Sequence, residues 1–234
     1  MQASRSGFTS RVTGSTTEAS AYSEGARAIA PIAVAAAAFG VTFGVLSQDV
    51  GMEPLAALAM SATTFAGSAQ FAAASILGAG GGAAAAVVAA ILLNARYAPI
   101  SVSVAPVFVG GPLRRIAESQ LIVDESWAVS RGHDGSYNRR ILIGAGLVLY
   151  TGWVGGTAVG AGAGDALGDP QRLGLDAAFP ALFLALLVPQ IRTRRALAAA
   201  LAGGGIALAL MPLAPAGVPI VAASAACLLG WRAR

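Results

Sequence analysis

Four long stretches of the chain carry no charged side chain, and they constrain its fold more than any other feature. They comprise residues 28–48, 54–95, 141–164 and 196–231. A membrane-spanning helix needs about 20 mostly apolar residues, so two stretches fit one helix each and two are long enough for a pair. Because lipid offers the backbone no hydrogen-bond partners, the spans must be helical, and the alternation of a transmembrane barrel is absent. The sequence therefore predicts an all-α integral membrane protein.

The composition agrees with this class and excludes several kinds of chemistry. Only 11% of the residues are charged, against about 25% in soluble domains. All fifteen basic residues are Arg, which excludes reactions that need a Lys, such as Schiff-base formation or phosphate binding by a Walker A loop. The one Cys, Cys227, lies in an apolar run, so no disulfide or Cys-rich metal site forms within the chain. No cofactor or metal is expected.

About six or seven hydrophobic segments are expected, separated by polar links. Residues 1–26 are rich in Ser, Thr and Gly and are typical of a flexible N-terminal tail, which leaves 27–234 as the transmembrane domain. The segments cover residues 27–48, 55–77, 83–109, 141–163, 177–191, 196–211 and 218–231. The connector at 110–140 mixes Arg with apolar residues such as Trp127, a pattern that favours an interfacial helix.

The charges between the segments predict the topology, since short Arg-rich loops stay in the cytoplasm. Arg27 and the five Arg residues of the connector at 110–140 place both the N-terminus and the connector inside. Three full crossings before the connector would put it outside. We therefore expect two crossings plus one broken or re-entrant element within 55–109, where protein must cover any non-helical backbone.

A possible internal repeat argues the other way. Gly40 and Gly44 in the first segment correspond to Gly156 and Gly160 in the fourth, and each pair precedes an acidic link and a Phe-containing segment. An inverted repeat of three plus three segments is common among membrane transporters and would place the connector outside. We rank the charge argument above the repeat.

Polar residues gather within the apolar sequence at 60–71. Gly67 allows a backbone or a ligand to approach closely, and the amide of Gln70 is costly in hydrocarbon unless it is paired. Phe65 adds an aromatic ring to the same stretch. Helix packing through small residues and hydrogen bonds between helices explains the pattern equally, so both interpretations stay open.

Asn94 and Arg96 form a second group, at an interruption of the segment 83–109. Arg96 is the only charge deep in this apolar stretch, and an intramembrane charge indicates function by default. Its guanidinium is suited to hold a carboxylate through two hydrogen bonds. Alternatively, Arg96 reaches an interface or forms a structural ion pair.

Acidic residues beside apolar segments are candidates for proton transfer or for binding an ammonium group. Asp124, with Glu125 next to it, and Asp176 each border such a segment, whereas Asp165 is more typical of a solvated loop. Asp165 also completes a G-x-G-D pattern that occurs in intramembrane aspartyl proteases. Those enzymes need a second Asp facing the first, and no charge-free segment here contains one.

Several motifs in order resemble the AzlC family of branched-chain amino-acid exporters. They are FGVTFG at 39–44, the whole of 60–71, LNARY at 93–97, DESWA at 124–128 and LDAAFPALFL at 175–184. These matches run in family order over roughly residues 25–231. The family often has His at the position of Tyr97, and this departure weakens a proton-relay role for that residue.

The resemblance implies a multi-pass protein of the bacterial inner membrane that exports branched-chain or similar apolar amino acids, driven by the proton-motive force. It also implies a small AzlD-like membrane subunit as a partner, no enzymatic activity and no binding of nucleic acid. The residues expected to line one substrate cavity are Phe65, Gly67, Gln70, Asn94 and Arg96. The expected proton-coupling candidates are Asp124 and Asp176. The alternatives are an intramembrane aspartyl protease and a non-transporting scaffold or channel.

Overall fold

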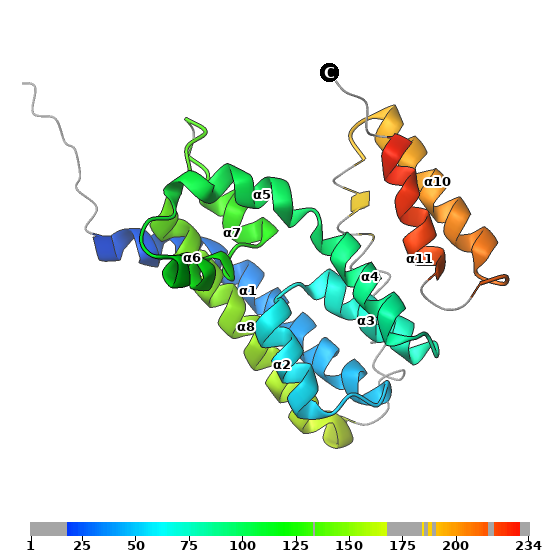
Figure 1. The fold of residues 1–234 in the computed structure, drawn as a ribbon. Coiled ribbons are helices and arrows are strands. Elements are labelled where there is room, and N and C mark those ends of the chain that lie inside the picture. Colours follow the sequence, from blue (N-terminus) through cyan, green and yellow to red (C-terminus); the bar gives the residue numbers. More distant parts are fainter. Residues whose placement is uncertain are drawn as a thin grey trace, which may run out of the picture.

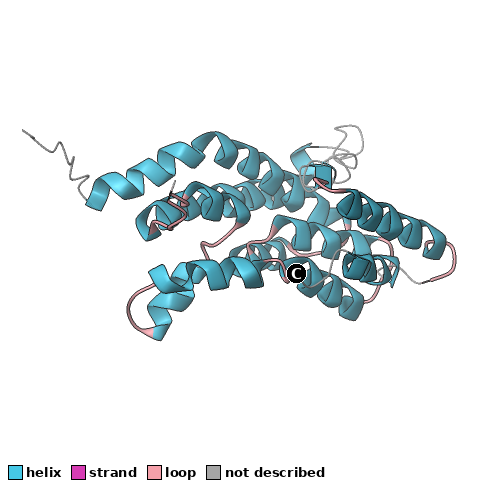
Figure 2. Ribbon diagram, turned by 90° about the horizontal axis from the view of Figure 1, so that it is seen from above, coloured by secondary structure: helices cyan, strands magenta, loops and turns pink. Residues whose placement is uncertain are grey.

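The computed structural model describes residues 18–132, 134–167, 184, 187–188, 191–214 and 218–229. Within these residues every regular element is helical (Figure 2). The only β-type feature among them is an isolated bridge between Arg131 and Tyr137. The α-helices are α1 (Glu18–Asp49), α2 (Pro54–Thr64), α3 (Gly67–Gly78), α4 (Ala83–Asn94), α5 (Tyr97–Val104), α6 (Pro112–Ser119), α7 (Asp124–Val129), α8 (Arg139–Leu167), α10 (Arg194–Leu210) and α11 (Val218–Ala223). Two 3-10 helices follow α5 and α11, namely η1 (Ala105–Val107) and η3 (Ser224–Leu229). The predicted all-α class is confirmed.

The centre of the fold is the pair α1 and α8, which lie side by side (Figure 1). Near their starts, Gly144 faces the carbonyl oxygen of Tyr22, and further along Gly160 faces that of Val41. Because the contact positions advance together along both helices, α1 and α8 are parallel. A Cβ atom at either glycine would overlap the facing carbonyl, so glycine is what allows the two backbones to approach this closely.

The contacts between α1 and α8 follow a local two-fold symmetry. Gly40 faces the carbonyl of Trp153, and Gly156 faces the carbonyl of Ala37. A shift of 116 positions converts one contact into the other, which is the mark of two-fold symmetry along the helix direction. The inverted repeat considered from the sequence is therefore wrong for this pair. The connector lies at the same end of the pair as the start of α1, in agreement with the charge argument.

The next two helices, α2 and α3, form a broken element that enters the bundle and returns to the end from which it came. α2 begins just beyond the end of α1. Phe65 has a left-handed backbone with φ 40°, and Ala66 is extended, so the chain turns between the two helices. α3 then runs back to Gly78, where a Cβ atom would overlap the side chain of Val50 near the end of α1. The predicted broken element is confirmed, and it divides the segment expected at 55–77.

The chain returns to its starting end through α4 and α5, which meet at a bend of 42°. A turn at Ala95 and Arg96 separates the two helices, at the interruption that the sequence predicts. Beyond the bend, Val104 and Phe108 pack in one cluster with Leu142, near the start of α8. The two helices together therefore pass from one end of the bundle to the other.

In the described part of the chain, two helices are long and apolar enough to cross a membrane, Ser20–Asp49 and Arg139–Ala163, and the bent pair α4 and α5 makes a third if it counts as one span. The apolar helix Val218–Leu229 is shorter and packs against α4 and α10 (Figure 1). The described part of the chain thus supplies two or three spans where the sequence predicts six or seven segments. The segment expected at 177–191 lies outside the described residues, apart from isolated positions.

The first helix starts earlier than the sequence suggests. α1 begins at Glu18, ahead of the start expected at Arg27. These added turns are held by α8, because Gly25 faces the carbonyl of Ile141. Part of the stretch expected to be a tail is therefore helical, while residues 1–17 lie outside the description. The connector holds two short helices, α6 and α7, where one interfacial helix was expected.

Candidate functional site

Three interruptions of the helices meet at one cavity of about 160 Å³. The break between α2 and α3 contributes Phe65 and Gly67, and the turn between α4 and α5 contributes Arg96. The start of α7 contributes Asp124 and Glu125. The apolar part of the wall comes mainly from α1 and α8 and includes Ile32, Ala36, Phe39, Leu149 and Trp153. The cavity therefore combines an apolar wall with one cationic and two acidic side chains.

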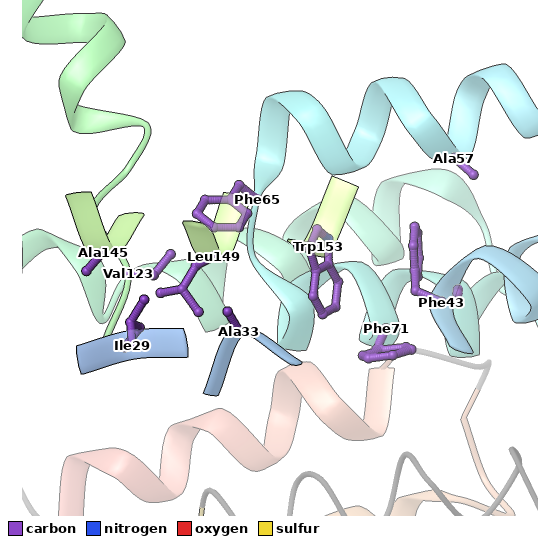
Figure 3. Close-up of a cluster of buried hydrophobic side chains, with 11 residues drawn as sticks. Ile29, Ala33, Phe43, Ala57, Phe65, Phe71, Val123, Ala145, Leu149 and Trp153 are labelled. Atoms are coloured by element: carbon purple, nitrogen blue, oxygen red, sulfur yellow. The ribbon is translucent and has the colours of Figure 1, made fainter. Parts of the chain in front are cut away.

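The indole of Trp153 closes one side of the cavity. In Figure 3, Trp153 stands between Phe65 and the two rings of Phe43 and Phe71. Its ring centroid lies 6.3 Å from that of Phe43 and 5.9 Å from that of Phe71. A Cβ atom on Gly67 would lie 2.8 Å from Cη2 of Trp153. Because Gly67 has no side chain, the indole of Trp153 approaches the backbone closely at this position.

The amide of Gln70 lies behind this wall, fully buried, in a closed ring of hydrogen bonds. Its Nε2 donates to Oγ of Ser61 at 2.8 Å, and that oxygen lies 2.8 Å from Oγ1 of Thr157. Thr157 donates to the carbonyl of Trp153 at 3.0 Å, and the indole Nε1 of Trp153 donates to Oε1 of Gln70 at 3.0 Å. Oε1 also accepts from the backbone N–H of Ala66 at 3.3 Å. Both ends of the amide thus hold α2, α3 and α8 together.

The charged end of Arg96 lies at the cavity. Its Nη2 is 3.1 Å from Oδ2 of Asp124 and donates to Oγ of Ser68 and to the phenol oxygen of Tyr97, both at 3.2 Å. The guanidinium carbon lies 5.0 Å from the centroid of the Tyr97 ring, within the range of a cation–π contact. The side chains of Arg96 and Asp124 are 37% and 38% exposed, so a molecule in the cavity reaches both. Arg96 is therefore ion-paired.

A tight turn before α7 carries Asp124 into the bundle. Ser126, which is fully buried, accepts a hydrogen bond from the N–H of Val123 at 3.0 Å and donates to the carbonyl of Leu121 at 2.8 Å. Val123 packs in the core with side chains of α1 and α8. Gly146 lets the backbone of Leu121 pass directly against α8. The start of α7 is thus fixed beside the cavity.

The amide of Asn94 lies away from the cavity. It lines a separate groove of about 660 Å³ together with apolar residues of α3 and α4, among them Leu77 and Ile91. Its Oδ1 is buried and has no hydrogen-bond partner among the described residues. Asn94 and Arg96 are two positions apart, a spacing at which helical side chains do not share a face.

The expectation that five residues line one cavity is therefore wrong in part. The cavity contains three of them, Phe65, Gly67 and Arg96. The two that do not line it are Gln70 and Asn94. Of the proton-coupling candidates, Asp124 lies at the cavity and Asp176 lies outside the described residues, as does the side chain of Asp165.

The main residue of the site that sequence reasoning missed is Trp153. It lies in an apolar, Gly-rich stretch that gives no polar signal. One indication was available, because a buried indole N–H needs an acceptor and an intramembrane amide such as Gln70 needs a donor. In the structure the indole N–H of Trp153 donates to the amide oxygen of Gln70, so each group is the partner that the other needs.

Comparison with known proteins identifies the family of the chain. The family model described as AzlC protein matches residues 31–167. An uncharacterized membrane protein of Archaeoglobus fulgidus is 34% identical over 86% of this chain and 90% of its own length. The inner membrane protein YgaZ of Escherichia coli is 26% identical over 82% of this chain and 84% of its own length.

A relative with a named transport role is more distant. The branched-chain amino acid transport protein AzlC of Bacillus subtilis is 24% identical over 74% of this chain and 69% of its own length. No solved structure matches the chain at a significant level. The segment matched by the family model contains every residue that lines the cavity. The chain therefore belongs to the AzlC protein family, whose members are membrane proteins associated with transport.

Proposed function

We propose that this chain exports branched-chain amino acids across the bacterial inner membrane, driven by the proton-motive force. The observation that carries the proposal is the ion pair of Arg96 and Asp124 in the wall of a mostly apolar cavity. Ligand sites for small molecules combine apolar walls with a few placed polar groups in this way. An amino acid presents the matching set, namely a carboxylate, an ammonium group and an apolar side chain.

In this proposal, binding exchanges one ion pair for two. The substrate carboxylate pairs with Arg96, and the substrate ammonium pairs with Asp124. Removing one partner from a fully buried ion pair costs about 3–5 kcal/mol, and less for a pair that keeps over a third of its surface exposed. A zwitterion avoids this cost, because neither Arg96 nor Asp124 is left as an uncompensated charge.

The apolar wall suits a branched aliphatic side chain. Phe65, Leu149 and Trp153 surround a cavity of about 160 Å³. An apolar cavity of about 150 Å³ accommodates a benzene molecule, so this cavity has room for a branched aliphatic group. Phe65 is itself held by Tyr150, whose ring centroid lies 5.0 Å away, which gives the wall a defined shape.

A small AzlD-like membrane subunit completes the exporter in this proposal, with the N-terminus and the connector of the multi-pass chain in the cytoplasm. The proposal of this small subunit is based on the family resemblance. We expect the chain to co-purify with a small membrane protein encoded nearby. Transport by the purified, monodisperse chain alone would contradict the requirement for this partner.

Efflux from cells loaded with a leucine-containing dipeptide tests the proposed function. Arg96→Lys keeps the positive charge but loses the planar fork of the guanidinium, so efflux should fall sharply at equal membrane expression. Arg114→Lys is the matched control, because the exposed side chain of Arg114 pairs with Glu118 on α6 and does not line the cavity. Equal efflux by Arg96→Lys and the wild-type protein would remove the main support for a carboxylate site at Arg96.

A further inference from the structure

A second carboxyl group lies at the cavity, that of Glu125, and its surroundings differ from those of Asp124. Both residues begin α7 and both line the cavity. Asp124 has the guanidinium of Arg96 as its counter-ion at 3.1 Å. Glu125 is half-buried and has no ion-pair partner among the residues that the structure describes. One of these neighbouring carboxyl groups is thus paired and the other is not.

Few charged or titratable groups surround Glu125 in the described part of the chain. They come from the α4–α5 turn, from α5 and from α7 itself, and they are Arg96, Tyr97 and Asp124. The described side chains that α1 and α8 present to the cavity are apolar, such as Leu149. On α7, which lies outside the spanning helices, burial raises the pKa of the Glu125 carboxyl above its ordinary value. A hydrogen bond from the residue's own backbone N–H opposes this shift, the negative charge of Asp124 adds to it, and the positive charge of Arg96 opposes it.

We propose that Glu125 is the group that binds and releases the proton exchanged for each amino acid. The proposal rests on the proposed export function and assigns the proton step to Glu125 in place of Asp124. The step is a protonation: the carboxylate takes up one proton from the side of higher proton activity and releases it on the other, and no other bond changes. Asp124 keeps a counter-ion throughout, either Arg96 or the substrate ammonium.

This arrangement also couples the proton to the substrate. The ammonium group of an amino acid bound at Asp124 adds a positive charge beside Glu125, and a nearby opposite charge favours the ionised form of a carboxyl group. Binding of the amino acid therefore expels the proton, and protonation of Glu125 weakens the binding of the amino acid. Such mutual exclusion is what an exporter that exchanges protons for amino acids requires.

Leucine transport in proteoliposomes that contain the full chain with its co-expressed small subunit tests this proposal. Glu125→Gln keeps a polar side chain of similar size but has no proton to exchange. We expect this variant to lose transport driven by an imposed pH difference and to keep counterflow, in which labelled leucine exchanges for unlabelled leucine without net proton movement. Glu53→Gln is the matched control, because Glu53 is an exposed carboxylate ahead of α2, and it should keep both activities.

A second variant, Glu125→Asp, keeps a titratable group and should retain pH-driven transport with a shifted pH dependence. It provides the test if Glu125→Gln does not fold. Wild-type pH-driven transport by Glu125→Gln would overturn the proposal. Loss of counterflow and of driven transport together in a well-folded Glu125→Gln protein would also overturn it, because this result indicates a role in substrate binding. If the wild-type protein shows neither activity with leucine, the export function itself fails.

Discussion

The indole Nε1 of Trp153 donates a hydrogen bond to Oε1 of Gln70 at 3.0 Å, so a side chain of α8 holds the amide at the start of α3. Gln70→Ala would leave this buried indole N–H unpaired and would remove the donor to Ser61. A buried polar group left without its partner costs about 1–3 kcal/mol. We therefore expect Gln70→Ala to lower both thermal stability and membrane expression. Thermal unfolding of the purified protein measures the first, and the amount of protein in the membrane measures the second.

The matched control for this variant is Thr63→Ala, which removes only a hydrogen bond from Thr63 to the carbonyl of Ala59 on an exposed face. Its stability should stay near that of the wild-type protein. A stable and well-expressed Gln70→Ala protein that fails in efflux would point instead to contact between the amide and the substrate, as the sequence first suggested.

The parallel pair of α1 and α8 gives a second prediction, with a control at the adjacent position. A Cβ atom on Gly156 would overlap the carbonyl of Ala37, whereas none of the described residues lies within 4 Å of one on Gly155. Overpacking of this kind costs about 1–3 kcal/mol, so Gly156→Ala should lower the unfolding temperature in detergent. Gly155→Ala should not lower it. Equal unfolding temperatures for the two variants would argue against close backbone packing at this crossing.

The coarse fold was predictable because it depends on local composition. Uncharged length predicted the spans that became α1 and α8, and the Arg residues predicted a connector at the same end as the start of α1. The break at Phe65 was not predictable, because a left-handed backbone is uncommon in a residue other than glycine. Its neighbours Thr64 and Ala66 also carry no turn signal. The structure holds this turn through the contacts of Phe65 and Gln70 with α8.

The candidate site was predictable only in part, for a related reason. Arg96 and Asp124 stand out as charges beside apolar sequence, but only the fold brings them together. Gln70 and its partner Trp153 are 83 residues apart, and a sequence does not state which donor meets which acceptor. Asn94 was misleading because proximity along the chain does not place two side chains on one face of a helix.

The ion pairs of Glu118 lead to a prediction about pH. Glu118 links α6 to the start of α8 through Arg139 and also pairs with Arg114. The hydrogen bond from Arg139, helped by that from Arg114, holds the pKa of the Glu118 carboxyl below its ordinary value. A carboxyl group with a lowered pKa in the folded state stabilises the fold above its unfolded pKa, and this stabilisation is lost as the pH falls through the folded pKa.

We therefore expect the wild-type protein to be more stable than Glu118→Gln at neutral pH. The difference should shrink as the pH is lowered below the ordinary carboxyl pKa. Unfolding temperatures measured across this pH range provide the test, with Glu53→Gln expected to follow the wild-type curve. Parallel curves for Glu118→Gln and the wild-type protein would show that these ion pairs do not contribute to stability.

The direction of α1 and α8 predicts which parts of the chain share a side of the membrane. In a Cys227→Ser background, Ser136→Cys in the connector should react with an impermeant thiol reagent from the cytoplasmic side. Glu53→Cys, just beyond the end of α1, should react from the opposite side. Both positions are exposed in the structure. Reaction of both cysteines from the same side would contradict the proposed crossing by α1.

The pairing of Arg96 with Asp124 predicts selectivity for zwitterions. The 2-oxo acid of leucine brings a carboxylate to Arg96 and leaves Asp124 without a counter-ion, while isopentylamine leaves Arg96 without one. A site with placed polar groups strongly rejects an analogue that lacks the matching group. Both analogues should therefore inhibit counterflow of labelled leucine far less than valine does.

The variant Asp124→Asn provides the internal comparison for this selectivity. It removes the carboxylate that the 2-oxo acid would otherwise have to displace from Arg96, so inhibition by the 2-oxo acid should rise relative to inhibition by isopentylamine. Inhibition by isopentylamine should not rise, because the variant offers no anion to the ammonium group of the amine. If valine, the 2-oxo acid and the amine inhibit the wild-type protein equally, then the pair of Arg96 and Asp124 does not recognise the charges of the substrate. Recognition would then depend on the apolar wall formed by Phe65, Leu149 and Trp153.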